Sequence, residues 1–318
     1  MYIWIIDEEW AGYDREEALL KKEFPGVEIK YSKNGTYRDD LEEAGKQADA
    51  VICQISVEMS ADIINGLKKC KVISVYGAGY NNVDVQAAKL RGIAVCNVPG
   101  YCVEDVSDWV IGAIYYCNKK IGAWDEAIAA GKWGAGAGEG TINRLSASTL
   151  LIVGYGRIGK AAAAKASALG MKVLIYSPSG KKPEGGLEGV SLKEGLSRAD
   201  FVSIHTALNR ETTKLVNRDF FSMMKKGAYF INASRGKVVD EAALIEAVKT
   251  NRIKGAVVDV VETEPPEKES PILHTRGITV TPHIAYLSED ALAELQETAA
   301  RNAADILKGR KTDNTVKI

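Results

Sequence analysis

The sequence predicts an α/β protein with two domains, each built on a doubly wound parallel sheet. Short runs rich in β-branched residues alternate with helical stretches along most of the chain, and the runs are almost continuously apolar, as in parallel strands buried on both faces. With 318 residues, the chain is also longer than one hydrophobic core usually serves. The expected strands are Tyr2–Ile6, Val27–Tyr31, Ala50–Cys53, Val72–Tyr76, Ala94–Asn97, Leu150–Val153, Val173–Tyr176, Phe201–Ile204, Tyr229–Asn232, Ala256–Val260 and Thr279–Thr281.

Two longer helices interrupt this alternation, at Val103–Ile121 and Ser288–Lys308. Acidic residues in the first turn of the first helix suit the helix dipole, and the second begins with a cap-like serine and ends at Gly309. We expect these helices to be the two crossings between the domains. One domain would then consist of residues 1–100 and 285–318, and the other of residues 101–284.

Composition and charge argue against several classes of protein. The formal net charge is -1, and the Lys and Arg residues are scattered, so no basic field exists to hold nucleic acid or an anionic membrane. The amino terminus lacks the features of a signal peptide, and no apolar stretch is long enough to span a membrane. Five cysteines without a C-x-x-C pair predict reduced thiols, no metal site and a cytoplasmic protein.

A glycine-rich motif follows the strand expected at Leu150–Val153 and opens a helix. Gly154 would make a tight turn, Gly156 would let the backbone approach a pyrophosphate, and Gly159 would allow close helix–strand packing. An ordinary glycine-containing turn is the simpler alternative, but this context favours a dinucleotide site. The candidate cofactor-binding residues of the motif are Gly154, Tyr155, Gly156, Arg157, Ile158 and Gly159.

Ser177 follows the next strand, at the place where an acidic residue would bind the ribose hydroxyls of NAD. Without a carboxylate, nothing there repels a 2′-phosphate, and Lys181 and Lys182 could bind one. The sequence therefore favours NADP over NAD. Alternatively, the two lysines belong to a solvated surface turn and NAD still binds.

Three later segments each end an expected strand with polar residues: Phe230–Gly236, Val257–Pro266 and Thr281–Ala285. The carboxyl ends of strands line the ligand crevice in an open parallel sheet, so these segments would face the nicotinamide end of the cofactor. With the motifs Gly77–Asp84, Arg144–Ser146 and Gly154–Gly159, they closely resemble the D-isomer-specific 2-hydroxyacid dehydrogenase family.

The resemblance covers essentially the whole chain and implies a fold, a reaction and an assembly. It implies a Rossmann dinucleotide-binding domain inserted into a split, flavodoxin-like substrate domain. It also implies an enzyme that interconverts a 2-oxo acid and a D-2-hydroxy acid with NAD or NADP. A homodimer would include Val103–Ile121 in its interface.

The expected chemistry requires a cation and a proton donor, because a 2-oxo acid carries a carboxylate beside a carbonyl group. Arg235 can offer a planar fork to these oxygens, and His283 can give the carbonyl oxygen a proton and take it back. Glu264 would orient the imidazole and stabilise its charged form. Each residue alone could be structural, but together and in this order they predict the catalytic centre.

The resemblance also implies further contacts. Asp259 would hydrogen-bond the nicotinamide carboxamide, and the backbone N–H groups of Ala78 and Gly79 would bind the substrate carboxylate. Tyr76 would flank the pocket, or it could simply be a packing tyrosine. The family usually has proline where Ala207 stands, so the loop beside the cofactor could differ here. The remaining candidate cofactor contacts are His205, Thr206, Ala233, Arg235 and His283, and the substrate contacts also include Arg235 and His283.

Two other functions remain open at this stage. Some proteins resembling this fold are dinucleotide-sensing corepressors, although the chain has no extended basic or low-complexity tail for a partner or DNA. A related reaction on a phosphorylated or phosphonate substrate would need an anion-binding cation beyond Arg235, and none can be placed. The small-molecule enzyme is therefore the favoured prediction.

Overall fold

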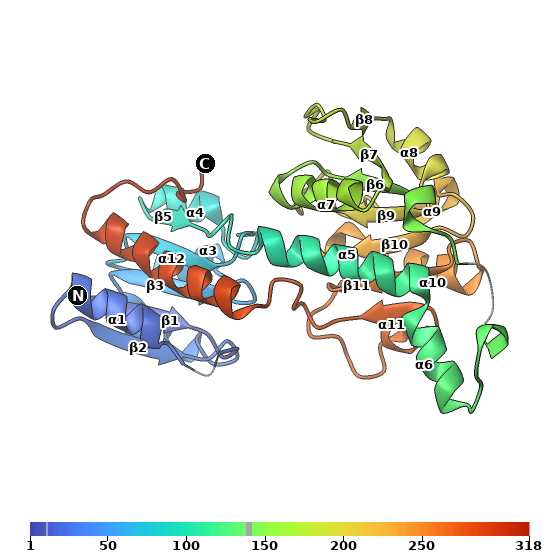
Figure 1. Ribbon diagram of the computed structural model, residues 1–318. Helices are drawn as coiled ribbons and strands as arrows, with labels where there is room; N and C mark the ends of the chain where they lie inside the picture. The colour runs from blue at the N-terminus through green and yellow to red at the C-terminus, as the bar shows by residue number, and fades with distance from the viewer. Residues whose placement is uncertain (11, 138–141, 318) are drawn as a thin grey trace. The chain divides into compact units, whose positions relative to one another are not determined.

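The chain folds into two compact units (Figure 1). The structure is a computed structural model that describes residues 1–10, 12–137 and 142–317. One unit combines Met1–Cys102 with Leu287–Ile318, and the other spans Val103–Tyr286. Within the described residues, the strands form one five-stranded and one seven-stranded sheet, with all strand pairs parallel.

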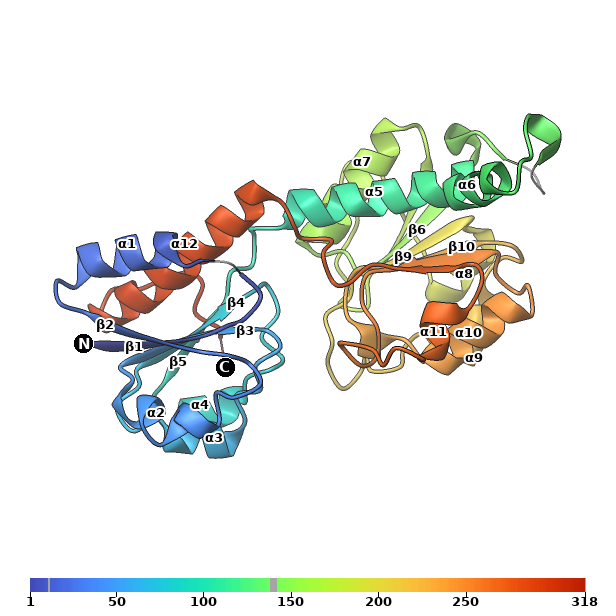
Figure 2. The same ribbon diagram turned by 90° about the horizontal axis from the view of Figure 1, so that it is seen from below.

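The sheet of the first unit has the strand order β2-β1-β3-β4-β5, the order of flavodoxin-like sheets. Figure 2 shows helices α1 and α12 on one face of this sheet and α2, α3 and α4 on the other. The strands are β1 (Tyr2–Ile6), β2 (Glu28–Ser32), β3 (Ala50–Gln54), β4 (Val72–Tyr76) and β5 (Ala94–Cys96). The helices are α1 (Asp14–Glu23), α2 (Ala44–Gln47), α3 (Ala61–Gly66), α4 (Val85–Leu90) and α12 (Glu289–Leu307), with a 3₁₀ turn at Asp39–Leu41.

Strand β1 shows how this unit fills both faces of its sheet. Successive side chains of a strand point to opposite faces, so an apolar run with no alternation serves two cores. Ile3 and Ile5 pack in the core that includes the small residues of α12, such as Ala299. Trp4 and Ile6 pack in the opposite core with residues of α2 and α3.

The second unit has the strand order β12-β11-β10-β9-β6-β7-β8, the order of doubly wound dinucleotide-binding sheets. Helices α5 and α7 lie on one face, and α8, α9, α10 and α11 on the other (Figure 2). The strands are β6 (Thr149–Val153), β7 (Lys172–Tyr176), β8 (Glu188–Gly189), β9 (Phe201–Ile204), β10 (Tyr229–Asn232), β11 (Gly255–Val258) and β12 (Ile278–Val280). The helices are α5 (Val103–Lys119), α6 (Ile121–Ala129), α7 (Arg157–Ala168), α8 (Leu192–Arg198), α9 (Arg218–Met223), α10 (Glu241–Lys249) and α11 (Pro271–His274), with 3₁₀ turns at Ala135–Ala137, Leu145–Ala147 and Gly236–Val238.

The predicted fold class is confirmed, but two details differ from the sequence analysis. The helix expected at Val103–Ile121 is α5, which ends two residues earlier because Lys120 adopts a left-handed backbone (φ 54°), and the separate helix α6 that follows was not predicted. Strand β8 was not predicted, since its two residues are exposed and carry no apolar pattern. The expected helix at Ser288–Lys308 is α12, and the Ser288 hydroxyl caps it by accepting the Ala291 N–H.

The cysteines at 53, 70, 96, 102 and 117 are all buried and form no disulfide with one another. The described residues contain no group of three or more His, Cys, Asp or Glu side chains that could hold a metal ion. In the same residues, no helix has both the length and the apolar character to cross a membrane.

Candidate active site

The three motif glycines each meet a different steric requirement at the carboxyl end of β6. Gly154 has φ 104°, and a side-chain carbon added there would lie 2.7 Å from the carbonyl group of His205 at the end of β9. A carbon added at Gly159 would lie 2.2 Å from the backbone oxygen of Gly154. At Gly156 the same carbon would meet nothing within 4 Å. Gly154 and Gly159 are therefore needed for packing, whereas Gly156 leaves space beside the backbone.

The amino terminus of α7 is suited to an anionic ligand. Gly156 is its N-cap and provides no side-chain cap, so the first N–H groups of this 12-residue helix receive no hydrogen bond acceptor from that position. Beside Gly154, the buried Oγ1 of Thr206 has no hydrogen-bond partner within the described residues. An open glycine, uncapped N–H groups and an unpaired hydroxyl at one sheet edge fit a dinucleotide cofactor.

His205 is fixed in its neutral form. Its Nε2 lies 2.9 Å from the hydroxyl of Ser203, and burial lowers the pKa of His205 to about 4. A histidine that is neutral at physiological pH is a poor proton donor. The sequence analysis named His205 only as a candidate cofactor contact, and that contact stays a prediction.

The loop after β7 carries the residues expected to contact the ribose. The hydroxyl of Ser177 accepts a hydrogen bond from the Lys181 N–H (3.2 Å) and lies 3.2 Å from the Ser179 hydroxyl. The Lys181 and Lys182 side chains are exposed, and neither forms an ion pair with any described residue. This corner therefore offers hydroxyl and ammonium groups, with no carboxylate at the end of β7.

The Arg235 loop is fixed by the last residue of β10. The side-chain amide of Asn232 donates to the backbone oxygen of Arg235 (3.1 Å), and its oxygen accepts the N–H of Ser234 (3.0 Å) and its hydroxyl (2.8 Å). Arg235 itself donates from Nη1 to the backbone oxygen of Ser234 (2.7 Å). Asn232 had no assigned role in the sequence analysis, although it ends a predicted strand inside a recognised motif.

Gly236 brings the Arg235 loop against the Glu264 loop. A side-chain carbon added at Gly236 would lie only 1.7 Å from the backbone oxygen of Val261, so any larger residue would separate the two loops. The Arg235 charge is close enough to contribute to lowering the pKa of Glu264. The structure thus brings the predicted cation and the predicted acid together.

Glu264 and His283 form a hydrogen-bonded pair. Glu264 Oε2 lies 2.7 Å from His283 Nδ1, and Oε1 accepts the Val261 N–H (3.0 Å). Burial alone would raise the pKa of Glu264, but the hydrogen bond and charge of His283, with smaller contributions from Val261 and Arg235, lower it overall. Glu264 is therefore ionised at neutral pH and can stabilise a protonated imidazole.

His283 has a left-handed backbone (φ 57°), which is unusual for a residue with a side chain. Its N–H donates to the backbone oxygens of Asp259 (2.8 Å) and Thr281 (3.0 Å). The carboxylate of Asp259, only 2% exposed, accepts hydrogen bonds from the Thr281 hydroxyl and from the N–H groups of Ile284 (2.9 Å) and Ala285 (2.8 Å). Asp259 therefore shapes the loop that presents His283, and about one of its roughly four acceptor positions remains for another donor.

The predicted substrate contacts Tyr76, Ala78 and Gly79 lie in the other unit, at the carboxyl end of β4. Tyr76 is 1% exposed, and its hydroxyl donates to Oε1 of Glu16 (2.8 Å). This position corrects the expectation that Tyr76 flanks the pocket, because a buried ring with an occupied hydroxyl is a packing tyrosine. The Ala78 backbone oxygen accepts a hydrogen bond from Asn97 (2.7 Å), which fixes the loop in place.

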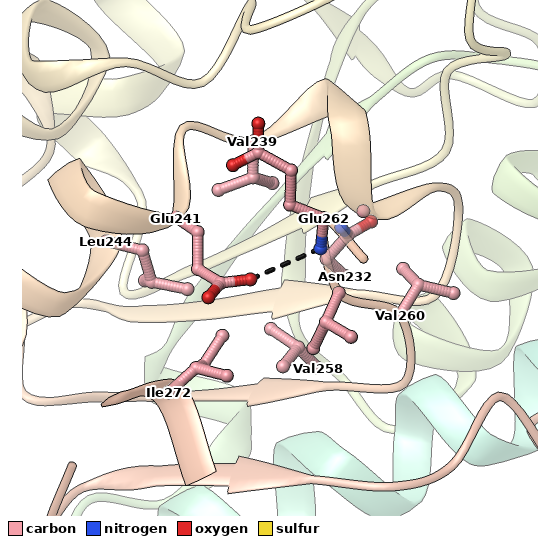
Figure 3. Close-up of a pocket in the computed structure, with 10 residues that line it drawn as sticks. Asn232, Val239, Glu241, Leu244, Val258, Val260, Glu262 and Ile272 are labelled. Atoms are coloured by element: carbon pink, nitrogen blue, oxygen red, sulfur yellow. Dashed lines mark hydrogen bonds between the residues drawn. The ribbon is translucent and has the colours of Figure 1, made fainter. Parts of the chain in front are cut away.

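A small cavity lies beneath the Arg235 and Glu264 loops, between β10, β11 and α10 (Figure 3). The Glu262 N–H donates to Glu241 across it (3.2 Å), and apolar residues such as Leu244 and Ile272 form the opposite wall. Its volume of about 10 Å³ is at most enough for one water molecule. It is therefore a packing gap and not a substrate pocket.

Comparisons with known proteins identify the family of this chain. The model of the family described as "D-isomer specific 2-hydroxyacid dehydrogenase, NAD binding domain" matches residues 111–285. A glyoxylate reductase of Thermofilum pendens is 34% identical over 278 residues, covering 86% of this chain and 82% of that protein. A D-3-phosphoglycerate dehydrogenase of Archaeoglobus fulgidus is 32% identical over 306 residues, or 95% of this chain, but the match spans only 58% of that protein.

A solved structure shares the whole architecture. The D-lactate dehydrogenase of Aquifex aeolicus, complexed with NAD and lactic acid, superimposes with a TM-score of 0.88 at 25% identity, covering 99% of this chain and 98% of that one. The fold is that of a dinucleotide-dependent oxidoreductase. The chain belongs to the D-isomer specific 2-hydroxyacid dehydrogenase family, whose members act on the CH–OH group of donors.

The surroundings of Gly159 and Gly156 predict different effects of an alanine at each position, on stability for the first and on dinucleotide affinity for the second. Gly159→Ala should destabilise the fold by about 1–3 kcal/mol, because the methyl group would force α7 away from Gly154. Gly156→Ala should change the free energy of unfolding by less than about 0.5 kcal/mol. It should nevertheless weaken dinucleotide binding by about tenfold, since its methyl occupies the open space. Urea unfolding and calorimetric titration test both; equal dinucleotide affinity in wild type and Gly156→Ala would contradict this assignment.

Proposed function

We propose that this protein is a nicotinamide-dependent enzyme that interconverts a 2-oxo acid and a D-2-hydroxy acid. The observation that carries the proposal is the Glu264–His283 pair beside Arg235, on the same sheet edge as the dinucleotide motif. Ordered acid–base pairs of this kind are typical of sites that move a proton. The Asp259 carboxylate supports the Glu264–His283 pair, because its hydrogen bonds hold the His283 loop in place.

The proposed proton donor and acceptor is Nε2 of His283. Nδ1 faces the ionised Glu264, which holds the N–H on that nitrogen and stabilises the ring when both nitrogens are protonated. Within the described residues, Nε2 has no hydrogen-bond partner. It is therefore the nitrogen that can protonate a carbonyl oxygen and recover the proton in the reverse direction.

Arg235 is the proposed substrate-binding cation. A guanidinium group presents parallel N–H donors that match a carboxylate and the adjacent carbonyl oxygen. A bound nicotinamide would supply the hydride for the carbonyl carbon. His283 supplies the proton, so the carbonyl becomes a hydroxyl group and the imidazole is left neutral. Substrate binding by Ala78 and Gly79 remains a prediction from the family resemblance.

We propose NADP as the preferred cofactor. The end of β7 carries Ser177 in place of a carboxylate, and the exposed Lys181 and Lys182 follow within six residues. Hydroxyl and ammonium groups favour a 2′-phosphate, which a carboxylate at this place would repel.

We also propose that the protein is a homodimer. Large apolar side chains are exposed along and after α6, where Ile121 and Ile128 are half exposed and Trp133 is 88% exposed. Exposed apolar groups gathered in one segment are typical of protein interfaces. A second copy of the chain would bury them, as the family resemblance predicts for the neighbouring Val103–Ile121.

The central experiment follows nicotinamide absorbance when the purified protein receives NADPH or NADH and one of several 2-oxo acids. The acids would be glyoxylate, hydroxypyruvate, 3-phosphohydroxypyruvate, pyruvate, phenylpyruvate and branched-chain 2-oxo acids. Faster oxidation of NADPH than of NADH is the expected result, and every product that has a stereocentre at C2 should be the D enantiomer. A strong preference for NADH would refute the cofactor assignment. Dinucleotide binding without turnover of any acid would instead support a dinucleotide-sensing protein.

Replacing His283 should abolish turnover and leave cofactor binding intact. His283→Asn is the most informative variant, because asparagine tolerates a left-handed backbone and cannot act as an acid or base. We expect kcat to fall at least about a hundredfold, with the dissociation constant for the dinucleotide nearly unchanged. His283→Ala should lose as much activity. Turnover near the wild-type rate in either variant would remove His283 from the mechanism.

The dimer is tested by sedimentation of Trp133→Glu. The proposed dimer would bury Trp133, so a charge at this position should weaken association by about thirtyfold or more. The variant should then be monomeric at concentrations where the wild type is dimeric. Leu90→Glu is the matched control, because Leu90 is equally exposed and lies in the other unit. A wild-type protein that sediments as a monomer would rule out the proposed assembly.

A further inference from the structure

The loop between β7 and β8 is attached at both ends to the dinucleotide motif. At its start, the backbone oxygen of Tyr176 accepts the N–H of Gly154 (2.8 Å). Seven residues after Ser177, the N–H of Glu184 donates to the hydroxyl of Tyr155 (3.3 Å), and Glu184 Oε1 lies 2.5 Å from Nζ of Lys160 on α7. Segment 177–184 is therefore held against Tyr155 and Lys160 beside the motif, and these residues together make up a corner.

Lys160 is a positioned cation in this corner. Its Nζ lies 5.4 Å from the centre of the Tyr155 ring, a distance at which a cation is attracted to an aromatic face. The bond to Glu184 raises the pKa of Lys160, so its side chain is charged throughout the neutral range. Lys160 belongs to the second turn of α7, whereas Lys181 and Lys182 lie on a loop. Its backbone is therefore already ordered before any ligand binds.

The ion pair between Lys160 and Glu184 costs little free energy to break, so Lys160 can bind another anion instead. The Lys160 and Glu184 side chains are 41% and 69% exposed, and ion pairs with such exposure contribute little to stability. A phosphate group carries more charge than a carboxylate and offers three strong acceptor oxygens. A phosphate that enters this corner should therefore displace Glu184 from Lys160.

We propose that Lys160 is a recognition cation for the 2′-phosphate of NADPH and that Glu184 competes with this phosphate for it. The proposal rests on the assignment of residues 154–184 as the dinucleotide site. NADH offers no phosphate there, so Lys160 stays paired with Glu184. Glu184 also repels a phosphate by its own charge. The Lys160–Glu184 pair thus sets how strongly the protein distinguishes the two cofactors.

Binding of adenosine fragments tests the proposal without catalysis. Calorimetric titrations would compare 2′,5′-ADP, which carries the 2′-phosphate, with 5′-AMP, which lacks it. Lys160→Met should weaken binding of 2′,5′-ADP by about tenfold, the loss expected for one charged hydrogen bond. Glu184→Gln should tighten it several-fold, and neither change should alter the affinity for 5′-AMP. The difference between the two fragments should shrink as salt is raised.

Two variants on the same unit serve as controls. Lys165→Met removes another lysine of α7, which pairs with Asp108. Glu194→Gln removes another exposed carboxylate, which pairs with Arg198. Both change the net charge of the unit as the test variants do, so neither should change the ratio of the two affinities.

Three results would overturn the proposal. These are unchanged 2′,5′-ADP binding in Lys160→Met, no preference of the wild type for 2′,5′-ADP over 5′-AMP, or weaker 5′-AMP binding in Glu184→Gln. The last would make Glu184 an acceptor for the ribose hydroxyls. Turnover of 2-oxo acids, measured on the same preparations, separates this proposal from the proposed function. A wild type that turns over 2-oxo acids but binds 2′,5′-ADP no more tightly than 5′-AMP counts against the Lys160 proposal alone.

Discussion

The buried carboxylate of Asp259 is the constraint on which the candidate active site depends. A left-handed residue other than glycine costs of the order of 1–3 kcal/mol, so His283 needs several hydrogen bonds to keep its backbone in place. Asp259 supplies them through its backbone oxygen and through a carboxylate that binds the residues on either side of His283. A buried carboxylate is stable only when such donors surround it. The charge and the loop therefore stabilise each other, and the imidazole reaches Glu264.

The parallel sheet explains how residues far apart in the sequence meet at one edge. Every strand pair of the second unit is parallel and in continuous register, so all carboxyl ends lie on the same side. The residues at or just after these ends are small, polar or charged, whereas most of those within β6, β9, β10 and β11 are apolar and buried. The reactive groups thus lie along one edge of the sheet, and the helices packed on its two faces keep that edge rigid. The residues at this edge are Gly154, Ser177, His205, Asn232, Asp259 and Thr281.

The sequence was sufficient for most of the fold, because strands buried on both faces are continuous apolar runs that can be located within one or two residues. It was not sufficient for β8, whose two residues are exposed, or for the break at Lys120, where the helical pattern continues. In the site, motifs identified Arg235, Glu264 and His283 by type and order. They did not reveal the burial of Tyr76, which depends on Glu16, sixty residues earlier in the chain. Contacts between distant segments carry no local signal.

The buried cysteines give the molecule a chemical property of its own. Burial raises the pKa of Cys53, Cys70 and Cys117 to about 12, and it also raises that of Cys96. The thiolate is the reactive form, so these side chains are almost entirely unreactive at neutral pH while the fold is intact. Oxidants and alkylating reagents would reach them only after local or global opening. The rate of thiol modification therefore reports how often each core opens, with Cys53 and Cys70 in the first unit and Cys117 in the second.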